Sequence, residues 1–564
     1  MAGHVFISQG DITQLSADAI AFSAANALLS NGNLYSSFDA HVPGFRDWYA
    51  ELRRREGGGL PIGTTFWMPL GDRKPRGVVV VVSTGADKVE DKAGVAVRNA
   101  IDTAVRELRA GKKGPAGGRL LIALPAFRVG LGGDHHQRLA SARAQVQAAR
   151  AALEQYHGVD VAFLTYTPAL YRIFLEARRL VGAAAESPAI PELERAIRDN
   201  ACVFFIGAGL SAGAGLPGWD ELVKRLTADL GLARLPGVDH LDVAQWYREE
   251  FGNERLAKVL GETFGGAGGL PTLAHYLLTG LPARHIITTN YDHLLERALK
   301  ALKRHPVAVV SQEDVTRTGG PGVYVVKIHG DAEHPADIVL TRDDYHAFFE
   351  RRPAMALLLE GLLLNQTFFF VGYSLRDPNF RQVFSRMARM LQESRRPAFA
   401  TSFDAQGDTA KLFRRQWRKQ QLHLIPIEGG TVEEQAYAFL RFLDGLAERV
   451  TMRSPPLALA ADVPPPAGIG RLRELLAEVG GEVQQLCADG AGEEDVRFLA
   501  QVLDFLTAHG WRPERMKPLC RLYEDLARHA TDADQRRRLL VAALGAAETF
   551  ADARGCGGAE ESQA

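Results

Sequence analysis

The strongest constraint on the fold of this 564-residue chain is a series of short, uninterrupted apolar runs between about residues 190 and 450. In order they read "ACVFFIG", "HIITTN", "VYVVKIHG", "TFFFVGYS", "AFATSF" and "LHLIPI". Apolar runs without polar alternation are typical of strands that are covered on both faces. Helix-length segments separate these runs, so the pattern predicts an α/β domain with a mostly parallel sheet.

Two further blocks flank this central one. Before residue 180 the runs "VVVVVS", "RLLIALP" and "DVAFLTY" alternate with helical patterns, which predicts a second α/β domain. Beyond residue 468 only helix-period runs occur, as in "VRFLAQVLDFLTAHG", which predicts an all-α domain. Pro- and Ala-rich linkers separate the blocks. The predicted domains are therefore residues 1–180, 190–450 and 468–553, with a helical subdomain over 219–281.

Composition excludes several classes of protein. The formal net charge of −1 provides no general attraction to nucleic acid or anionic lipid. Four scattered cysteines form no CxxC pair, so neither a zinc ribbon nor a disulfide framework is expected, and no metal is expected. The apolar stretch 355–374 is interrupted by Glu360, Asn365 and Gln366, which favours a helix followed by a strand over a membrane span. Without a signal peptide, a cytoplasmic protein is expected.

A turn of small residues follows the first central strand. The sequence "FFIGAGLSAGAGLP", residues 204–217, leads from an apolar run into a turn of glycine, alanine and serine. Backbone N–H groups at such a turn can hold a phosphate, since missing side chains allow close approach. The alternative is a tight corner without a ligand.

Polar residues follow the other central strands. They are Thr288, Thr289, Asn290 and Asp292 in "IITTNYD", His329 and Asp331 in "VVKIHGD", and Ser374, Asp377 and Asn379 in "FFFVGYSLRDPN". In an open α/β sheet, ligands bind beyond the carboxyl ends of the strands. The sequence therefore predicts one ligand site at this edge.

Together, "GAGLSAGAGLPGW", "TTNYD", "KIHGD" and "GYSLRDPN" resemble the sirtuin-like fold, in particular the NAD-consuming defence proteins of bacteria related to Thoeris systems. The resemblance covers about residues 193–447 and implies NAD as the substrate. It places Asn290 and His329 at the reacting ribose. The cofactor-binding set that it implies is Gly207, Ala208, Gly209, Ser211, Thr288, Asp292, Ser374 and Asp377.

The reaction can be argued from the residue types. Cleavage of the nicotinamide–ribose bond passes through an oxocarbenium-like sugar, and a histidine that titrates near neutrality can accept a proton from water or a ribose hydroxyl. An asparagine fixes the ribose or orients water. The chain lacks the four-cysteine zinc module of deacylating sirtuins and has "PGWDEL" where they carry "PDFR", which favours water as the acceptor. Protein ADP-ribosyl transfer, deacylation and an inactive nucleotide-binding adaptor remain alternatives.

The N-terminal block resembles a second family. "ISQGDITQLSADAIAFSAANALLSNGNL" and "LIALPAFRVGLGG" are similar to macrodomains, over about residues 3–175. The resemblance implies an ADP-ribose-type ligand, with Asp11 at the adenine amino group and Asn26 at the distal ribose. The diphosphate would lie on Gly130, Gly132 and Gly133. "SNGNLYSSFD" replaces the glycine run of hydrolytic macrodomains, so a scaffold role, with Asp11 as a turn residue, is the alternative.

These features predict a cytoplasmic NAD hydrolase that depletes NAD in antiphage defence. We expect the macrodomain-like module to regulate it and the chain to form a homo-oligomer. His275, in "TLAHYLL", is expected to be a core histidine.

Overall fold

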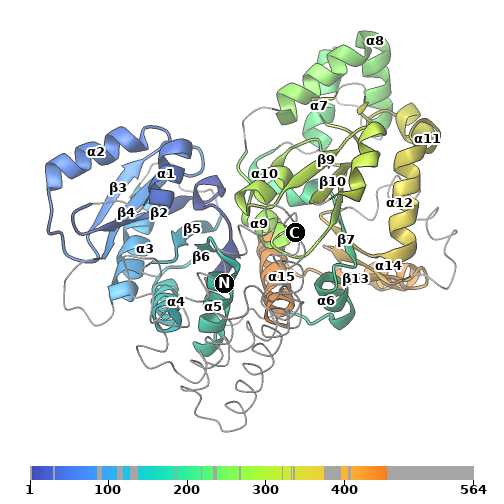
Figure 1. Cartoon of the computed structure of the whole chain (residues 1–564). Coiled ribbons are helices and arrows are strands. Elements are labelled where there is room, and N and C mark those ends of the chain that lie inside the picture. Colours follow the sequence, from blue (N-terminus) through green and yellow to red (C-terminus); the bar gives the residue numbers. More distant parts are fainter. Residues whose placement is uncertain are drawn as a thin grey trace, which may run out of the picture.

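The computed structural model contains two sheets, each flanked by helices (Figure 1). It describes residues 3–28, 32–84, 92–110, 118–127, 138–183, 187–216, 219–232, 238–265, 269–320, 322–331, 333–334, 337–373, 396–403 and 408–453. The predicted C-terminal domain, residues 468–553, lies outside these ranges.

The N-terminal block is built on a six-stranded sheet of order β1-β6-β5-β2-β4-β3. Only the β3–β4 pair is antiparallel among the pairs described. The strands are β1 Val5–Gln9, β2 Ala19–Ala25, β3 Thr65–Pro69, β4 Gly77–Thr84, β5 Leu120–Pro125 and β6 Val159–Thr165. The helices are α1 Gly32–His41, α2 Phe45–Glu56, α3 Lys92–Ala110, α4 Arg138–Gln155 and α5 Pro168–Leu180. The predicted α/β class is confirmed.

The central block has a seven-stranded, all-parallel sheet of order β13-β12-β11-β7-β8-β10-β9. Its strands are β7 Cys202–Ile206, β8 His285–Thr288, β9 Pro306–Val309, β10 Val323–Lys327, β11 Thr367–Val371, β12 Ala398–Ser402 and β13 Leu422–Pro426. Its helices are α6 Pro191–Arg198, α7 Trp219–Asp229, α8 His240–Leu260, α9 Leu273–Thr279, α10 Leu294–Ala301, α11 Arg342–Arg351, α12 Pro353–Asn365, α14 Asp408–Arg418 and α15 Val432–Arg453. The predicted parallel sheet is confirmed.

Burial explains why the apolar runs became strands. Every residue of β7, β10 and β11 is buried, as expected for strands covered on both faces. The apolar stretch 355–374 divides into α12 and β11, as predicted. Among the described residues, no helix has both the length and the apolar character needed to cross a membrane.

The sequence analysis did not name β1, β2 and β3 of the N-terminal sheet, and it missed one strand of the central sheet, β9. The edge strand β9 has four residues, begins with a proline and is mostly half-buried or exposed. Its residues are apolar, but the run is short and begins with a proline, which is typical of turns and edge strands.

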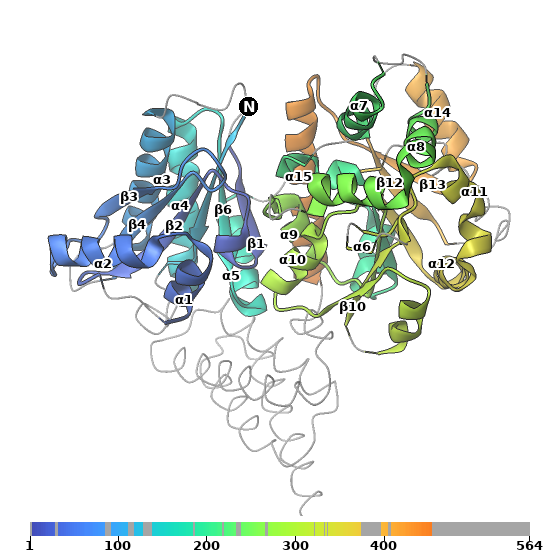
Figure 2. The ribbon, with the colours of Figure 1, turned by 90° about the horizontal axis from the view of Figure 1, so that it is seen from above.

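Helix α15 lies between the two blocks (Figure 2). It belongs to the central block but contacts α5 of the N-terminal block as well as α6 and α9. One apolar cluster accordingly runs through both blocks, and it includes Phe6, Ile12, Tyr276 and Leu443. The two blocks thus share a buried interface. The predicted domain bounds remain a prediction.

A buried group of charges ties α15 to the N-terminal block. The side chain of Arg178, from α5, is fully buried and contacts Asp444 Oδ2 at 2.6 Å and Glu448 Oε2 at 2.5 Å, both on α15. His4 Nε2 lies 2.7 Å from the same Asp444 oxygen. Burial opposes ionisation of Asp444, but Arg178 and His4 more than offset it and lower its pKa.

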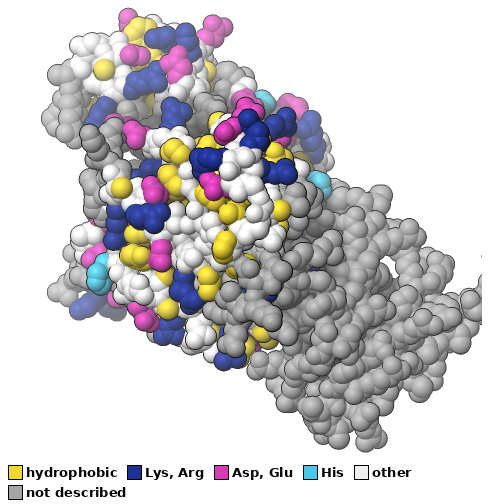
Figure 3. Space-filling view, turned by 90° about the vertical axis from the view of Figure 1, so that its left-hand side faces the viewer, with side chains coloured by type: hydrophobic (Ala, Val, Ile, Leu, Met, Phe, Trp, Pro, Cys, Tyr) yellow, Lys and Arg dark blue, Asp and Glu magenta, His cyan; other side chains and the backbone are white. Residues whose placement is uncertain are grey.

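Surface charges are mixed in sign. Figure 3 shows the side of the molecule that is on the left in Figure 1, and cationic and anionic side chains alternate over its described part. Some of these side chains pair with an opposite charge on the same helix, as Arg54 does with Glu51 on α2.

Candidate functional site

The polar residues identified from the sequence follow strands that are neighbours in the central sheet. The order β11-β7-β8-β10 places four strand ends side by side. The register pairs Ile206 with both Val371 and Thr288, and Thr288 with Lys327. Parallel strands end at the same edge, so the residues that follow them converge there. The predicted convergence on one edge is confirmed for the described residues.

The small-residue turn after β7 is packed against the end of β11. A Cβ on Gly207 would lie 2.6 Å from the carbonyl oxygen of Gly372, and one on Gly209 would lie 2.8 Å from it. The Gly209 N–H donates to that same oxygen at 2.9 Å, and the Gly207 N–H donates to Val371 O. The close approach at these two glycines is therefore made by the chain itself, and both N–H groups are engaged. Their predicted phosphate role stays a prediction.

Gly372 follows β11 and packs against the small-residue turn after β7. Its φ is +66°, and an added Cβ would lie 2.5 Å from Leu210 N. Gly372→Ala should lower the free energy of unfolding by about 2–4 kcal/mol, from left-handed strain and overpacking combined. Urea unfolding of both proteins measures the loss.

Gly215→Ala is the matched control, because Gly215 has a φ of +75° with no atom within 4 Å of its added Cβ. This substitution should lower the free energy of unfolding by about 1–2 kcal/mol, because only backbone strain is introduced. Equal losses of unfolding free energy in the two variants would show that the contact of Gly372 with the small-residue turn contributes nothing to stability.

Asn290 is held by its amide nitrogen. The side chain is 6% exposed, and Nδ2 donates to Gly207 O at 3.3 Å and to Ser211 Oγ at 3.1 Å. The carbonyl of Gly207 can only accept, so the nitrogen must face it. The buried Oδ1 has no hydrogen-bond partner among the described residues. A buried acceptor without a partner suits a hydroxyl or N–H group of a ligand.

His329 follows the neighbouring strand, β10, and is 8% exposed. Its Nδ1 lies 3.4 Å from Tyr345 Oη, and its ring centroid is 6.5 Å from that of Tyr291. Burial, followed by the charge of Arg352, lowers its pKa to about 3. The expected titration near neutrality is therefore wrong for this conformation, because burial disfavours the imidazolium. At pH 7 the ring is neutral and can accept a hydrogen bond.

Thr288 and Asp292 have structural partners. Thr288 Oγ1 donates to Ile206 O at 3.1 Å and accepts the Asn290 N–H at 3.0 Å, which joins β7 to β8. The Asp292 carboxylate accepts the Leu294 N–H at 3.0 Å at the start of α10. Burial raises the pKa of Asp292, although hydrogen bonds from Leu294 and Ser211 oppose the shift. The predicted contacts of Thr288 and Asp292 with NAD remain predictions.

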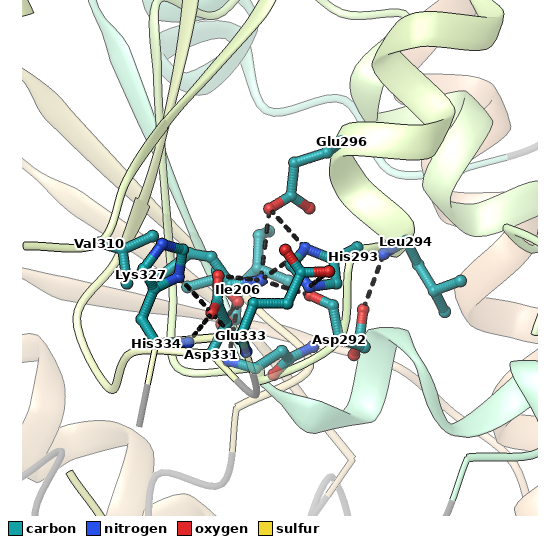
Figure 4. A network of polar contacts seen from close by, with 12 residues as sticks. Ile206, Asp292, His293, Leu294, Glu296, Val310, Lys327, Asp331, Glu333 and His334 are labelled. Carbon is teal, nitrogen blue, oxygen red and sulfur yellow. Dashed lines mark hydrogen bonds and ion pairs between the residues drawn. The ribbon is translucent and has the colours of Figure 1, made fainter. Parts of the chain in front are cut away.

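A buried lysine joins the two loops that carry Asn290 and His329 (Figure 4). Lys327 Nζ donates to Asp292 O at 2.7 Å and lies 3.3 Å from Glu296 Oε1 and 3.8 Å from Asp331 Oδ2. Burial opposes ionisation of Glu296, but Lys327 and His293 together more than offset it and lower its pKa. The sequence analysis missed this residue. The signal was a lysine inside an otherwise apolar strand, "VYVVKIHG".

The candidate ligand residues of the N-terminal block are only partly described. The Asp11 carboxylate accepts from Thr13 N at 2.9 Å, Thr13 Oγ1 at 2.7 Å and Ser37 Oγ at 2.6 Å, so it caps the short helix Ile12–Gln14. These contacts fit the alternative role as a turn residue. Asn26 lies at the end of β2, where its N–H donates to Thr84 O.

Several predicted residues lie outside the described ranges. They are Gly130, Gly132 and Gly133 of the N-terminal block and Ser374, Asp377 and Asn379 of the central block. Ala208 and Ser211 lie in the small-residue turn, with Ala208 exposed and Ser211 buried. The described residues contain no group of three or more side chains suited to a metal ion.

Comparison with known proteins identifies sirtuin-type relatives. Residues 284–425 match the SIR2-like domain family. The NAD(+) hydrolase ThsA of Cytobacillus dafuensis is 30% identical over 241 residues, which cover 43% of this chain and 46% of the relative. ThsA of Enterococcus faecium is 33% identical over 215 residues, 37% of this chain and 45% of the relative. The chain thus spans less than half the length of the curated relatives it matches.

Macrodomains appear among the similar solved structures. The Oceanobacillus iheyensis macrodomain with MES bound has a TM-score of 0.27 and 21% identity, and covers 31% of this chain and 90% of its own length. The same macrodomain with ADP has a TM-score of 0.27 and 20% identity, with the same coverage. The segment that matches the SIR2-like domain family, residues 284–425, contains both Asn290 and His329.

Proposed function

We propose that this chain is an NAD hydrolase that cleaves the nicotinamide–ribose bond and releases nicotinamide and ADP-ribose. The observation that carries the proposal is the buried Asn290 Oδ1, which has no partner among the described residues. It lies where four parallel strands end, and His329 follows the adjacent strand. The ThsA relatives, which are named NAD(+) hydrolases, support the same reaction.

Asn290 and His329 have different roles in this proposed reaction, which follow from the chemistry of their side chains. Water adds to the anomeric carbon of the ribose as nicotinamide leaves, and the water proton is released. Asn290 Oδ1 accepts a hydrogen bond from the sugar or the attacking water, which fixes their geometry. Neutral His329 accepts a hydrogen bond from a second hydroxyl.

The biological role follows from this reaction. We propose that the enzyme depletes NAD in the cytoplasm of an infected bacterium, that the N-terminal block regulates it through an ADP-ribose-type nucleotide, and that it works as a homo-oligomer. A curated relative from Bacillus subtilis, 26% identical, is named a defense-associated sirtuin. Uncontrolled NAD cleavage would kill an uninfected cell, so such an enzyme needs a trigger.

Incubation of the full-length protein with labelled NAD tests the reaction. Free ADP-ribose and nicotinamide in equal amounts, with no label on protein, are expected. Stoichiometric label on protein would indicate ADP-ribosyl transfer instead. No turnover with or without added nucleotides, together with unchanged phage resistance in cells that carry His329→Ala, would indicate an adaptor.

Contacts between the two blocks support the proposed regulation. Tyr276, on α9, donates its hydroxyl to Asp11 O at 2.9 Å, and a Cβ on Gly10 would lie 2.0 Å from its ring. The Ser16 N–H donates to Pro271 O at 2.9 Å. Helix α9 therefore touches the loop that contains the candidate adenine residue.

Tyr276→Phe should weaken this link while the ring stays against Gly10. The ratio of NAD hydrolysis with and without added ADP-ribose should move toward one, while loss of a single hydrogen bond costs about 1 kcal/mol of unfolding free energy. Steady-state rates on the full chain measure the ratio. Deletion of residues 1–180 is a poorer test, because it would expose the apolar cluster shared by both blocks.

Tyr49→Phe is the matched control, since the buried Tyr49 also donates to a backbone carbonyl, Leu28 O at 2.8 Å, away from the interface. Its ratio should equal that of the wild type. A wild-type rate that does not respond to ADP-ribose, or equal responses of the two variants, would contradict regulation by this nucleotide through Tyr276.

A further inference from the structure

His275 is the residue beside Tyr276 on α9, and its side chain is fully buried. The sequence predicted a core histidine, and its burial confirms this. The ring is not surrounded only by apolar atoms, however. Its Nδ1 faces Thr272, at 3.2 Å from the backbone nitrogen and 2.8 Å from Oγ1, and its Nε2 lies 3.4 Å from Ser211 Oγ. The imidazole therefore bridges the start of α9 and the small-residue turn after β7.

The contacts of the ring fix which nitrogen carries the proton. The Thr272 backbone N–H can only donate, so Nδ1 must present its lone pair. Burial lowers the pKa of His275 to about 3, so the imidazole is neutral at pH 7 and carries a single proton. That proton is on Nε2. The Nε2–H group consequently donates to Ser211 Oγ.

The Ser211 hydroxyl oxygen is the acceptor in its hydrogen bonds with both His275 and Asn290. It accepts from His275 Nε2–H and from Asn290 Nδ2–H, which occupies both lone pairs. Its own proton is left for a carboxylate, and the hydrogen bond of Ser211 lowers the pKa of Asp292. Each hydrogen bond in the series from Thr272 through His275 and Ser211 to Asn290 thus has one possible direction.

We propose that His275 is a positioning residue for Asn290 and acts through the hydroxyl of Ser211. This inference rests on the proposed hydrolysis of NAD, in which Asn290 Oδ1 contacts the substrate. His275 fixes Ser211 as an acceptor, and Ser211 together with Gly207 O holds the amide nitrogen. The amide oxygen is then held toward the substrate before NAD binds, which is the preorganisation that catalysis requires.

The helix cap alone does not account for a histidine at this position. Thr272 and His275 form a capping box, a motif in which the third helical residue is usually Glu or Gln. Any of these side chains can accept the Thr272 N–H. A neutral imidazole, like a glutamine amide but unlike a glutamate, has in addition a donor, and here that donor faces Ser211.

The test separates positioning from helix capping in the full-length enzyme. His275→Leu removes both the acceptor and the donor and should lower kcat about 10- to 100-fold, with KM within about threefold. His275→Gln offers an acceptor to Thr272 and a donor to Ser211, so it should restore most of kcat. In a Ser211→Ala background, His275→Leu should cause little further loss of kcat, because both substitutions interrupt the same series of hydrogen bonds.

Thr272→Ala is the matched control. It removes the capping hydroxyl but keeps the backbone N–H that sets the His275 tautomer, so it should lower the melting temperature and leave kcat within about threefold of the wild type. The proposal is overturned if Thr272→Ala and His275→Leu lower kcat equally, if His275→Gln restores nothing, or if the effects of Ser211→Ala and His275→Leu multiply.

Crystal structures of the His275→Leu and Thr272→Ala proteins give a second readout that does not need turnover. Ser211 and Asn290 should leave their wild-type rotamers only in His275→Leu. Unchanged rotamers in that variant would overturn the positioning role even if the enzyme is active. A wild-type protein that does not hydrolyse NAD would instead contradict the proposed function, and the structures would still decide the role of His275.

Discussion

Asn290→Ala and His329→Ala should each lower kcat for NAD hydrolysis by at least about 10²-fold, because each removes a group that we propose to contact the reacting ribose. Asn290 supplies a buried amide oxygen with no partner among the described residues, and His329 supplies a neutral imidazole at the end of the adjacent strand. Release of nicotinamide from NAD by purified variants measures the effect. Both variants should unfold cooperatively, since each substitution lies beyond the end of its strand.

The controls separate chemistry from packing. Asn290→Asp keeps the shape and one oxygen but loses the amide protons that donate to Gly207 O and Ser211 Oγ, so it should also be impaired. His285→Gln replaces another imidazole of the same sheet, at the start of β8 rather than beyond its end, and should retain activity within about threefold. Wild-type rates in His329→Ala, or losses as large in His285→Gln, would contradict the proposed site.

The sheet could be predicted because burial on both faces leaves a direct mark on sequence. Strand β7 is wholly apolar and β11 is apolar after Thr367, and the residues that follow the central strands are mostly small or polar. Strand β9 was missed although its residues are apolar, because it has only four residues and begins with Pro306. The class of fold followed from the central strands alone, whereas the sharing of α15 between two blocks could not be predicted, because its amphipathic pattern does not identify its neighbours.

The site was predictable to the level of strand ends but not to the level of contacts. Asn290 and His329 were found because parallel strands finish at one edge. The contact made by Gly207 and Gly209 with Gly372 was not foreseen, since a glycine that admits a ligand and one that admits a neighbouring backbone look alike in sequence. Lys327 and the polar contacts of His275 were missed for a related reason. A single polar residue within an apolar segment reveals its partners only in three dimensions.

Arg178→Met should lower the free energy of unfolding by about 3–5 kcal/mol, because it leaves Asp444 and Glu448 buried without their cation. Arg178 also donates to Val5 O at 3.0 Å, so the variant loosens β1 as well as the α5–α15 contact. Urea unfolding at pH 7 measures the loss. Since Asp444 has a folded pKa below that of the unfolded chain, wild-type stability from this group is present at pH 7 and falls as the pH drops below about 4. Arg178→Met should lose that part of the pH dependence.

Arg179→Met is the matched control for this buried ion pair. Arg179 follows Arg178 on α5, but it is half-exposed and its partner Glu176 lies 3.4 Å away on the same helix, so its loss should cost less than about 1 kcal/mol. A triple variant that replaces Arg178, Asp444 and Glu448 with apolar residues should regain most of the stability lost in Arg178→Met, because no unpaired charge is left buried. If Arg178→Met and Arg179→Met are equally stable, the buried cluster does not hold α15 on the N-terminal block. Helix α15 would then be held there by the shared apolar cluster alone.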